Sequence, residues 1–262
     1  MLRSYKSELI RFRKTAFVGA GVMAAFTALV TTLIFVGFEE PTGPGAGRGP
    51  IAAVGDLASV DGVLAGLAAA ATMIGIVALA LFAISVARDY ERGTIRQLLV
   101  GEPRRALVLG GKMLALLTTV VAGVAVAALV GIGAAFALAP VAGVGTAAWT
   151  TGAAVSASLS TTVNVAIASM VWGFAGAGLA IATRSSSTAI TVGIGYLLVG
   201  EPLVQLVWDT SSDWLVSGTL TTFTNGGTEL VSYGQSAMLL ALYAAAFVVA
   251  TLVVFQRRDI TN

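Results

Sequence analysis

Residues Arg88–Lys112 read RDYERGTIRQLLVGEPRRALVLGGK and separate two long apolar stretches. They hold nine charged residues, in a chain whose charged residues number 15 Lys or Arg and 13 Asp or Glu. Thr94 and Gln97 have the spacing of a capping box, which starts a helix. Gly101 suits the position just past a helix end, and Pro103 prevents the helix from continuing. The stretch predicts a short helix inside a charged hairpin.

One face of this short helix is apolar, because Ile95, Leu98 and Leu99 recur at three- and four-residue spacing. A helix of this length is not stable alone in water. We therefore expect the Ile/Leu face to dock against a partner. The alternative is a solvated charged loop that only obeys the positive-inside rule.

The composition of the chain indicates an integral membrane protein. Hydrophobic residues make up 57% and charged residues 11% of 262 residues, and the mean hydropathy is +0.91. A soluble domain has about a quarter of its residues charged. With neither cysteine nor histidine in the sequence, disulfides, thiolate metal sites and a histidine general base are excluded. We expect a single transmembrane domain over residues 1–262.

The apolar stretches predict an all-α membrane protein with six transmembrane helices. The segment 1–15 has an apolar stripe of Leu2, Tyr5, Leu9 and Phe12 opposite cations, which predicts an amphipathic helix in the membrane interface. The following apolar run is too long for a signal peptide, so we expect an uncleaved span. The spans are expected at about 16–38, 62–87, 107–138, 153–183, 187–207 and 235–255.

Three polar segments connect these spans. The charged hairpin covers 88–106, and two external segments cover 39–61 and 208–234. The first of these is rich in Gly and Pro, with a short surface helix possible at 52–61. In the fourth span the beginning is weakly polar, which places it near the outer surface or in a helix contact. The small residues that follow favour close helix packing.

Basic residues are distributed asymmetrically, which predicts the orientation in the membrane. Six spans place both termini on one side, and 14 of the 15 Lys and Arg residues then lie on that side, while Arg48 lies on the other. By the positive-inside rule, both termini are cytoplasmic. The cations on the cytoplasmic side are Arg3, Lys6, Arg11, Arg13, Lys14, Arg88, Arg92, Arg96, Arg104, Arg105, Lys112, Arg184, Arg257 and Arg258.

The sequence lacks the residues that ATP hydrolysis requires. Gly110-Gly111-Lys112-Met113 resembles only the end of a phosphate-binding loop and has no hydroxyl for magnesium. The acids do not form a catalytic pair, and no histidine can serve as a base. We therefore expect a protein that is not an enzyme by itself and that binds no cofactor.

The hairpin resembles the loop between the second and third spans of permeases in type-2 ATP-binding-cassette (ABC) exporters. The similar residues are ERGTIRQLL at 91–99, PRR at 103–105 and Lys112. The rest of the chain is also similar: a basic first helix, six spans, YLLVGEP at 196–202 and an Arg-Arg-Asp tail at 257–259. The first external loop is longer and richer in Gly and Pro than in that family.

This resemblance implies a function and partners. Such permeases form homo- or heterodimers in the lipid membrane, and each protomer docks on a separate ATPase subunit that binds ATP and Mg. The prokaryotic inner membrane is the implied location, and no nucleic acid is involved. A mostly apolar lining favours a hydrophobic or amphipathic substrate such as a lipid, peptide or drug. The coupling helix would be Thr94 to Val100, and the implied coupling residues are Glu91, Gly93, Thr94, Ile95, Leu98, Leu99 and Arg104.

Several polar residues within the spans are candidates for a translocation path. Glu201 precedes Pro202 in the fifth span, where a charge is costly. It either lines or gates the path, or it caps a helix break by pairing with backbone N–H groups. Asn164, Thr161 and Thr162 either line the path or make hydrogen bonds between helices. The four tryptophans are expected to be interfacial anchors rather than ligands.

Two other functions stay open from the sequence. A secondary carrier or channel driven by an ion gradient would need paired acids or broken helices in repeated halves. A membrane subunit that does not transport could instead convert the motion of an ATPase into signalling or assembly.

Overall fold

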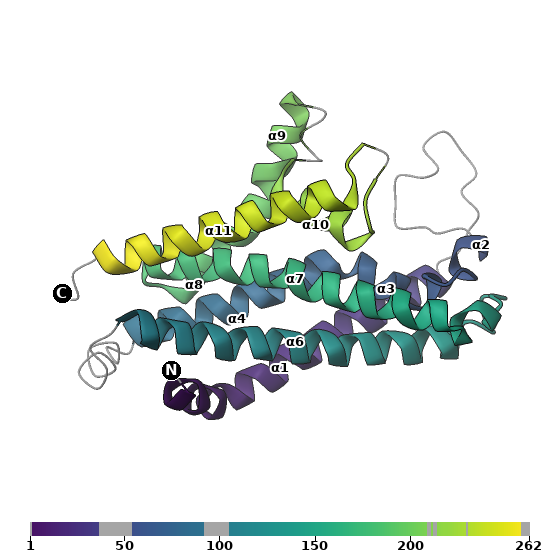
Figure 1. Cartoon of the computed structure of the whole chain (residues 1–262), viewed down its shortest axis with the longest axis horizontal. Coiled ribbons are helices and arrows are strands. Elements are labelled where there is room, and N and C mark those ends of the chain that lie inside the picture. The colour runs from purple at the N-terminus through teal and green to yellow at the C-terminus, as the bar shows by residue number, and fades with distance from the viewer. Residues whose placement is uncertain are drawn as a thin grey trace.

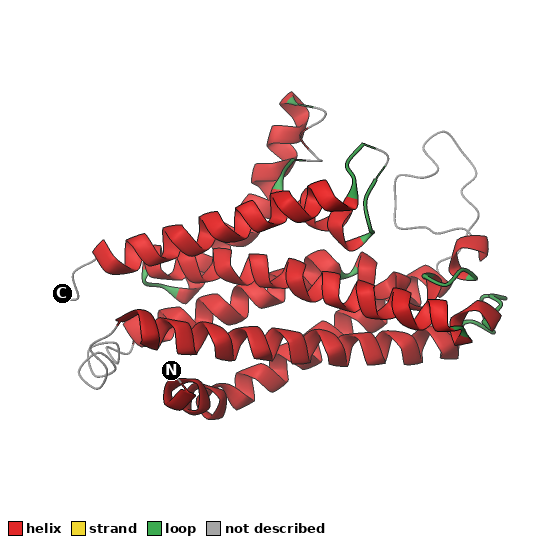
Figure 2. Cartoon of the chain, viewed as in Figure 1, coloured by secondary structure: helices red, strands yellow, loops and turns green. Residues whose placement is uncertain are grey.

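The computed structural model describes residues 2–36, 54–91, 105–208, 211, 214–228 and 230–257. These residues fold into an all-α membrane protein with six candidate spans, each long and apolar enough to cross a bilayer. Outside the helices, the only β-type pairing in the described residues is one isolated bridge between Gly227 and Ser232. Figures 1 and 2 show the long helices side by side along one axis.

The first, second and third spans come from α1, α4 and α6. α1 covers Leu2–Val36 and α6 covers Arg105–Leu138. Between them lie α2 (Val54–Leu57), a 3-10 turn η1 (Gly62–Leu64), α3 (Ala65–Ala69) and α4 (Ala71–Glu91). The second span is thus interrupted near Ala70, whereas the sequence predicts one helix over 62–87.

The other three spans come from α7, the pair α8–α9, and α11. α7 covers Gly152–Thr183 and follows a 3-10 turn η2 at Ala147–Thr150. α8 (Ser186–Gly195), a π-helical turn η3 (Tyr196–Gly200) and α9 (Glu201–Val207) form the fifth span. α10 covers Val216–Thr224, and α11 covers Tyr233–Arg257.

The N-terminal region differs from the prediction of an interfacial helix followed by a separate span. α1 is one uninterrupted helix, because no Gly or Pro occurs between Leu2 and Phe17 to break it. Its first turns are seen nearly end-on in Figure 1 and the remainder from the side, so the helix changes direction. Phe12 of the predicted apolar stripe is buried in the protein core, and this part of the stripe therefore faces protein rather than lipid.

Both ends of the molecule can be identified from the described helices. The first turns of α1, the end of α4, the start of α6 and the end of α11 lie toward one end, which we call the inner end (Figure 1). α2, α3 and the end of α6 lie toward the opposite, outer end. This arrangement agrees with six crossings and both termini on one side.

The core is built around α4 and α7, which pack closely because small residues meet at their contact. A Cβ added at Gly176 would lie 2.3 Å from the backbone carbonyl oxygen of Leu79, and one at Gly75 would lie 2.4 Å from the Trp172 ring. Only glycine allows this approach of two helices in lipid. The prediction of small-residue packing in α7 is confirmed.

Two tryptophans were expected at the membrane interface and lie in the core instead. Trp149 is 5% exposed and Trp172 is 3% exposed. The Trp149 indole donates to the carbonyl oxygens of Leu57 and Ser59 at 3.0 and 3.1 Å. It therefore fixes α2 at the outer end, a role that interfacial anchoring does not predict. Trp208 and Trp214 remain about half exposed.

Part of the segment 208–234, which the sequence predicts to be external, packs against the helical bundle. Leu220 and Phe223 of α10 are buried against Trp172 and Leu240, residues of α7 and α11. α9, by contrast, projects away from the bundle (Figure 1). The hydropathy of 208–234 is too low to indicate a span, but a short helix can bury a few apolar side chains against its neighbours.

Candidate functional site

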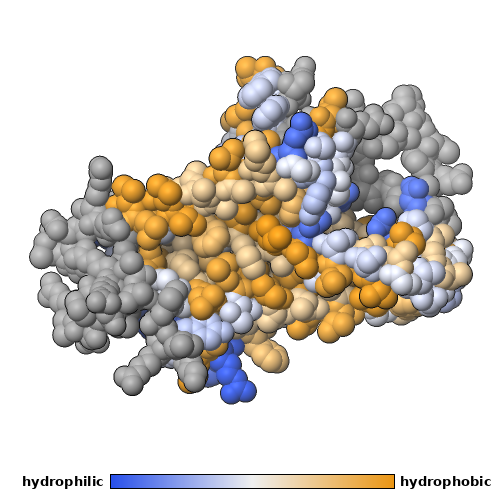
Figure 3. Space-filling view, in the orientation of Figure 1, coloured by the Kyte–Doolittle hydropathy of each residue, from blue (hydrophilic) through white to orange (hydrophobic). Residues whose placement is uncertain are grey.

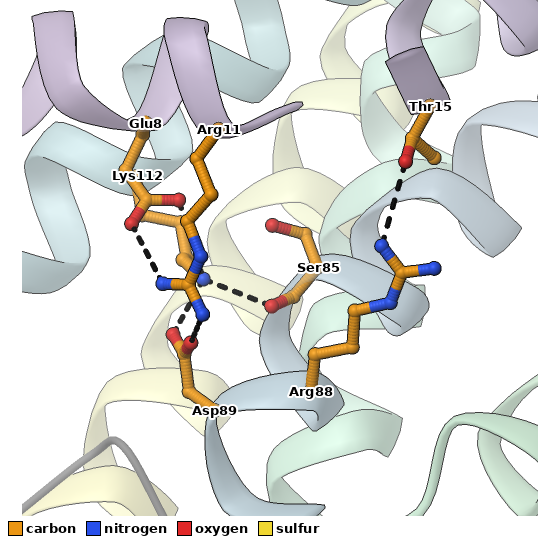
Figure 4. Close-up of polar contacts among 7 residues, drawn as sticks. All are labelled: Glu8, Arg11, Thr15, Ser85, Arg88, Asp89 and Lys112. Carbon is orange, nitrogen blue, oxygen red and sulfur yellow. Dashed lines mark hydrogen bonds and ion pairs between the residues drawn. The ribbon is translucent and has the colours of Figure 1, made fainter. Parts of the chain in front are cut away.

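Four charged side chains meet inside the inner end, and we call Glu8, Arg11, Asp89 and Lys112 the charged quartet (Figure 4). The Lys112 ammonium lies 2.5 Å from an Asp89 carboxylate oxygen and 3.5 Å from a Glu8 carboxylate oxygen. Arg11 lies 3.1 Å from Asp89 and 3.5 Å from Glu8. Each cation thus contacts both carboxylates.

Three members of the quartet are buried, and its charges are balanced. Side-chain exposure is 7–8% for Lys112, Asp89 and Glu8, and 37% for Arg11. Lys112 also donates to the backbone carbonyl of Ser85 at 2.8 Å. Burying an unpaired charge costs several kcal/mol, and this cost is offset here because two cations face two carboxylates.

The quartet joins α1, α4 and α6 at the two borders of segment 92–104. Asp89 lies in the last turn of α4, and Lys112 lies two turns into α6. Next to the quartet, Arg88 donates to the Thr15 hydroxyl at 3.4 Å. Helix α1 therefore holds the end of α4 and the start of α6, the two helices that border segment 92–104.

Glu91, at the end of α4, connects this border to one more helix, α8 of the fifth span. Its carboxylate accepts hydrogen bonds from the backbone N–H and the hydroxyl of Ser186, both at 2.8 Å. Ser186 begins α8, where an acceptor satisfies an otherwise unpaired N–H group. Of the predicted coupling residues, only Glu91 is described; Gly93, Thr94, Ile95, Leu98, Leu99 and Arg104 lie outside the described residues.

The sequence places Lys112 and Arg11 on the cytoplasmic side of the membrane, but it does not predict that they form the quartet with Glu8 and Asp89. A signal was present: Glu8 is the only acid between Met1 and Phe38, and it precedes Arg11 by one helical turn. Such an isolated acid among basic residues indicates an internal partner. The identity of that partner, which lies on a different helix, is not readable from local spacing.

The outer end contains a polar cavity of about 930 Å³, which we call the outer cavity. Its walls come from the region of α2 to α4, from the outer half of α7 and from α10. A second cavity of about 440 Å³ adjoins it, since Thr72 and Thr221 line both. Figure 3 shows hydrophilic residues toward the outer end and also on the lower side near the inner end, while most of the visible bundle surface between them is hydrophobic.

Glu201 lines the second cavity and also holds α10 in place. It is 1% exposed. Its carboxylate accepts hydrogen bonds from the backbone N–H of Ser217 at 3.1 Å and from the Ser217 hydroxyl. Tyr196, one turn earlier, is a further hydrogen-bond partner. Ser217 lies in the first turn of α10, where a carboxylate is favourable. The carboxylate thus pairs with a backbone N–H group, as one of the two alternatives requires, and a role in a translocation path stays a prediction.

The other path candidates lie at the cavity wall or form hydrogen bonds, and their role in a path stays a prediction. Thr161 and Asn164 both line the outer cavity. Asn164 also donates to the Phe223 carbonyl at 3.3 Å and accepts from the Tyr233 hydroxyl at 2.9 Å. Thr162 donates to the Ser158 carbonyl within its own helix. Asn164 thus connects α7 with α10 and α11 at the cavity wall.

Comparison with protein families gives a match over most of the chain. A model described as "Protein of unknown function (DUF2705)" matches residues 50–261. The chain belongs to the DUF2705 family. No curated protein and no solved structure matches it.

The DUF2705 match begins after α1 and includes α2 to α11. Asp89, Lys112 and Glu201 fall within it, whereas Glu8 and Arg11 precede it. Among the described residues of this DUF2705 protein, no group of three or more His, Cys, Asp or Glu side chains could hold a metal ion. The two sites thus consist of paired charges at the inner end and a cavity with polar and apolar lining at the outer end.

Proposed function

We propose that this protein is the permease subunit of an ABC exporter, in which a separate subunit hydrolyses ATP. The permease would work as a homo- or heterodimer in a prokaryotic inner membrane, with both termini cytoplasmic. Its substrate would be hydrophobic or amphipathic. The chain itself would carry out no catalysis, and ATP and Mg would bind to the partner.

The observation that carries this proposal is the anchoring of both borders of segment 92–104. The charged quartet holds the end of α4 and the start of α6 on α1, and Glu91 holds the start of α8. A force applied to the segment is therefore transmitted to four of the six spans. A loop that was merely solvated would not need buried ion pairs, which are costly to form.

A second support is the arrangement of the outer cavity relative to that segment. The outer cavity touches α4, α7 and α10, and α4 runs from it to the quartet. A shift of α4 that begins at the inner end would change the cavity walls. Such a rigid element connecting two sites is what an ATP-driven transporter requires.

The test is affinity purification of the full chain from its native membranes, with ATP hydrolysis and mass spectrometry as readouts. We expect an ATP-binding subunit to co-purify and to hydrolyse ATP. Leu98→Asp should remove both, because a charge on the apolar face prevents docking. Leu98→Met is the matched control and should retain them, because it keeps the face apolar.

The proposal is wrong if wild-type protein carries no ATP-hydrolysing subunit, or if Leu98→Asp keeps it with normal turnover. Thermal unfolding of both variants checks that the spans remain folded. ATP-dependent substrate flux in sealed vesicles then separates an exporter from a subunit that couples an ATPase to signalling or assembly.

One observation favours a different class of transporter. Glu201 is a buried acid beside a π-helical turn and Pro202, and secondary carriers use acids at helix breaks. A carrier would move substrate under an imposed proton or sodium gradient without ATP. Flux driven by such a gradient in ATP-free vesicles would favour this alternative over the exporter.

A further inference from the structure

The first turns of α1 expose a large apolar face to the surroundings of the protein. Ile10 is 77% exposed and Phe17 is 82% exposed. These two residues are seven positions apart, so they lie on the same side of the helix, about two turns from each other. The buried residues Glu8 and Phe12 lie on the opposite side. We define the α1 patch as the exposed residues Ile10, Arg13, Lys14 and Phe17.

Two cations lie between the apolar side chains of the α1 patch. Arg13 and Lys14 are each three or four residues from both of them, so the four side chains are neighbours on the helix surface. Both cations are exposed, and neither forms an ion pair with any residue that the structure describes. The acid of these turns, Glu8, points inward and belongs to the quartet. The α1 patch therefore carries two positive charges between two apolar groups.

The α1 patch lies where the first span meets the inner membrane surface. The first turns of α1 are seen nearly end-on in Figure 1, whereas the long helices are seen from the side, so these turns run across the direction of the spans. Further along the same helix, exposed apolar side chains continue into the span at Val18, Leu29 and Leu33. The α1 patch is therefore continuous with the lipid-facing surface of the first span.

A phospholipid with a net negative charge matches both kinds of group in the α1 patch. When a helix lies along a membrane surface, its apolar side chains enter the border of the acyl chains, and the long stems of Lys and Arg reach the headgroups. A zwitterionic headgroup has no net charge to balance the two cations, whereas an anionic one has. A soluble acidic protein would balance the cations, but it would have to displace lipid from Ile10 and Phe17.

We infer that the α1 patch binds an anionic phospholipid of the inner leaflet. The phosphate would accept hydrogen bonds from Arg13 and Lys14, and the acyl chains would lie against Ile10 and Phe17. The opposite side of the same turns carries Glu8 of the quartet, so a bound lipid would hold α1 in the orientation in which the quartet forms. This inference depends neither on ATP nor on the exporter proposal.

The experiment measures which lipid lies beside the α1 patch. Val18→Cys, in a chain without other cysteines, is labelled with the fluorophore bimane, and the full chain is placed in bilayers of equal amounts of phosphatidylcholine and phosphatidylglycerol. Bromine on the acyl chains of one lipid quenches the label on contact, and exchanging the brominated lipid gives the preference. We expect phosphatidylglycerol to be preferred at least about fivefold, the factor that one cation near an anionic membrane surface contributes.

Two variants test whether charge causes this preference. Arg13→Gln with Lys14→Gln should reduce it to less than about twofold, because both charges are lost. The matched Arg13→Lys/Lys14→Arg variant keeps both charges and should stay within about twofold of wild type. Raising the ionic strength from about 0.01 to 1 M shortens the screening length from about 30 to 3 Å and should also lower the preference. The melting temperature in pure phosphatidylcholine should be the same for all variants, because both side chains are exposed.

A label at Leu29→Cys is the control for position. Leu29 is 55% exposed on the same helix, but it lies eleven residues, or about 16 Å, from Val18, so the label there should show no preference.

The inference is overturned if both lipids quench the Val18 label equally, if the double Gln variant keeps the full preference, or if the Leu29 label shows the same preference. Equal quenching would assign the cations to an acidic protein instead. Failure of the exporter proposal gives a different result: the lipid preference persists, but no ATP-hydrolysing subunit co-purifies.

Discussion

The two ends of this protein handle charge in opposite ways. At the inner end, the buried Glu8, Asp89 and Lys112 and the partly exposed Arg11 pair their charges within 3.5 Å. At the outer end, Asp56 and Asp61 line a cavity together with hydroxyl groups and no described cation. Paired charges in a buried position hold helices rigidly together, whereas the exposed carboxylates of Asp56 and Asp61 lie at the border of a cavity. The difference is one of packing: the inner end is held together by paired charges, whereas the outer end contains open space.

The largest effect should follow from breaking the inner joint. Lys112→Met removes a cation that contacts both Glu8 and Asp89 and leaves two buried carboxylates with Arg11 alone. We expect a loss of about 3–5 kcal/mol in stability, the cost of an uncompensated buried charge. Thermal unfolding in detergent or nanodiscs measures it.

Two comparisons control this prediction. Lys14→Met removes an exposed cation of helix α1 and should change stability by less than about 0.5 kcal/mol. Asp89→Asn added to Lys112→Met should recover part of the loss, because the remaining charges balance again. Equal stability of Lys112→Met and wild type would contradict a rigid inner joint.

The next effect concerns the contact between α4 and α7, which runs between the two ends. Gly176→Ala places a methyl group against the Leu79 backbone of α4 and should destabilise the protein by about 1–3 kcal/mol through overpacking. Gly133→Ala is the matched control in α6, because a Cβ there meets nothing within 4 Å. It should leave stability unchanged or raise it by up to about 1 kcal/mol. Loss of the same size in both variants would show that helix α4 and helix α7 are not in close contact.

A smaller effect is expected for Glu201 at the outer end. Glu201→Gln keeps the shape of the side chain and can still accept from Ser217, so we expect a loss of about 1–2 kcal/mol, as for one weakened charge-assisted hydrogen bond. Substrate-stimulated ATP hydrolysis and vesicle transport are measured beside the melting temperature. If transport falls more than stability does, Glu201 acts in the path; if both change together, its role is to hold α10.

The last prediction should not alter stability but tests which end faces outward. The native chain has no cysteine, so single cysteines can be labelled without background. Asn225→Cys at the outer end should react with an impermeant maleimide in intact cells, and Ser187→Cys at the start of α8 should not. Both positions are exposed. Labelling of Ser187→Cys alone would invert the assignment of inner and outer ends.

Several features of the fold could be predicted because they depend on local composition. Six apolar stretches indicated six spans, and α6 ends at Leu138, just before Ala139-Pro140. The Gly-rich half of α7 indicated close packing, and the lack of cysteine and histidine excluded whole classes of site. Each of the helix signals lies within one contiguous stretch of the chain and needs no knowledge of the neighbouring helices.

The predictions that were wrong share one cause: side chains are buried against segments that are distant in the sequence. Trp149 and Trp172 fall near the ends of apolar runs or within one, and composition alone cannot separate an interfacial ring from one packed on Leu57 or Gly75. The threonines of α10 lower its hydropathy, yet Thr219 and Thr222 are buried within the protein. Threonine can lie inside a membrane protein when its hydroxyl bonds to its own helix, as Thr224 does.

The sequence by itself determined that this is a six-span, all-α membrane protein with its cations gathered on one side, because hydropathy and charge act residue by residue. Only the tertiary structure decided that Lys112 meets Asp89 and Glu8, and that Glu201 meets Ser217. Those pairings join residues that lie on different helices. The physical reason is that a buried charge is stable only beside its counter-charge or its hydrogen-bond partners, and which of these lies beside it is fixed by how the helices pack.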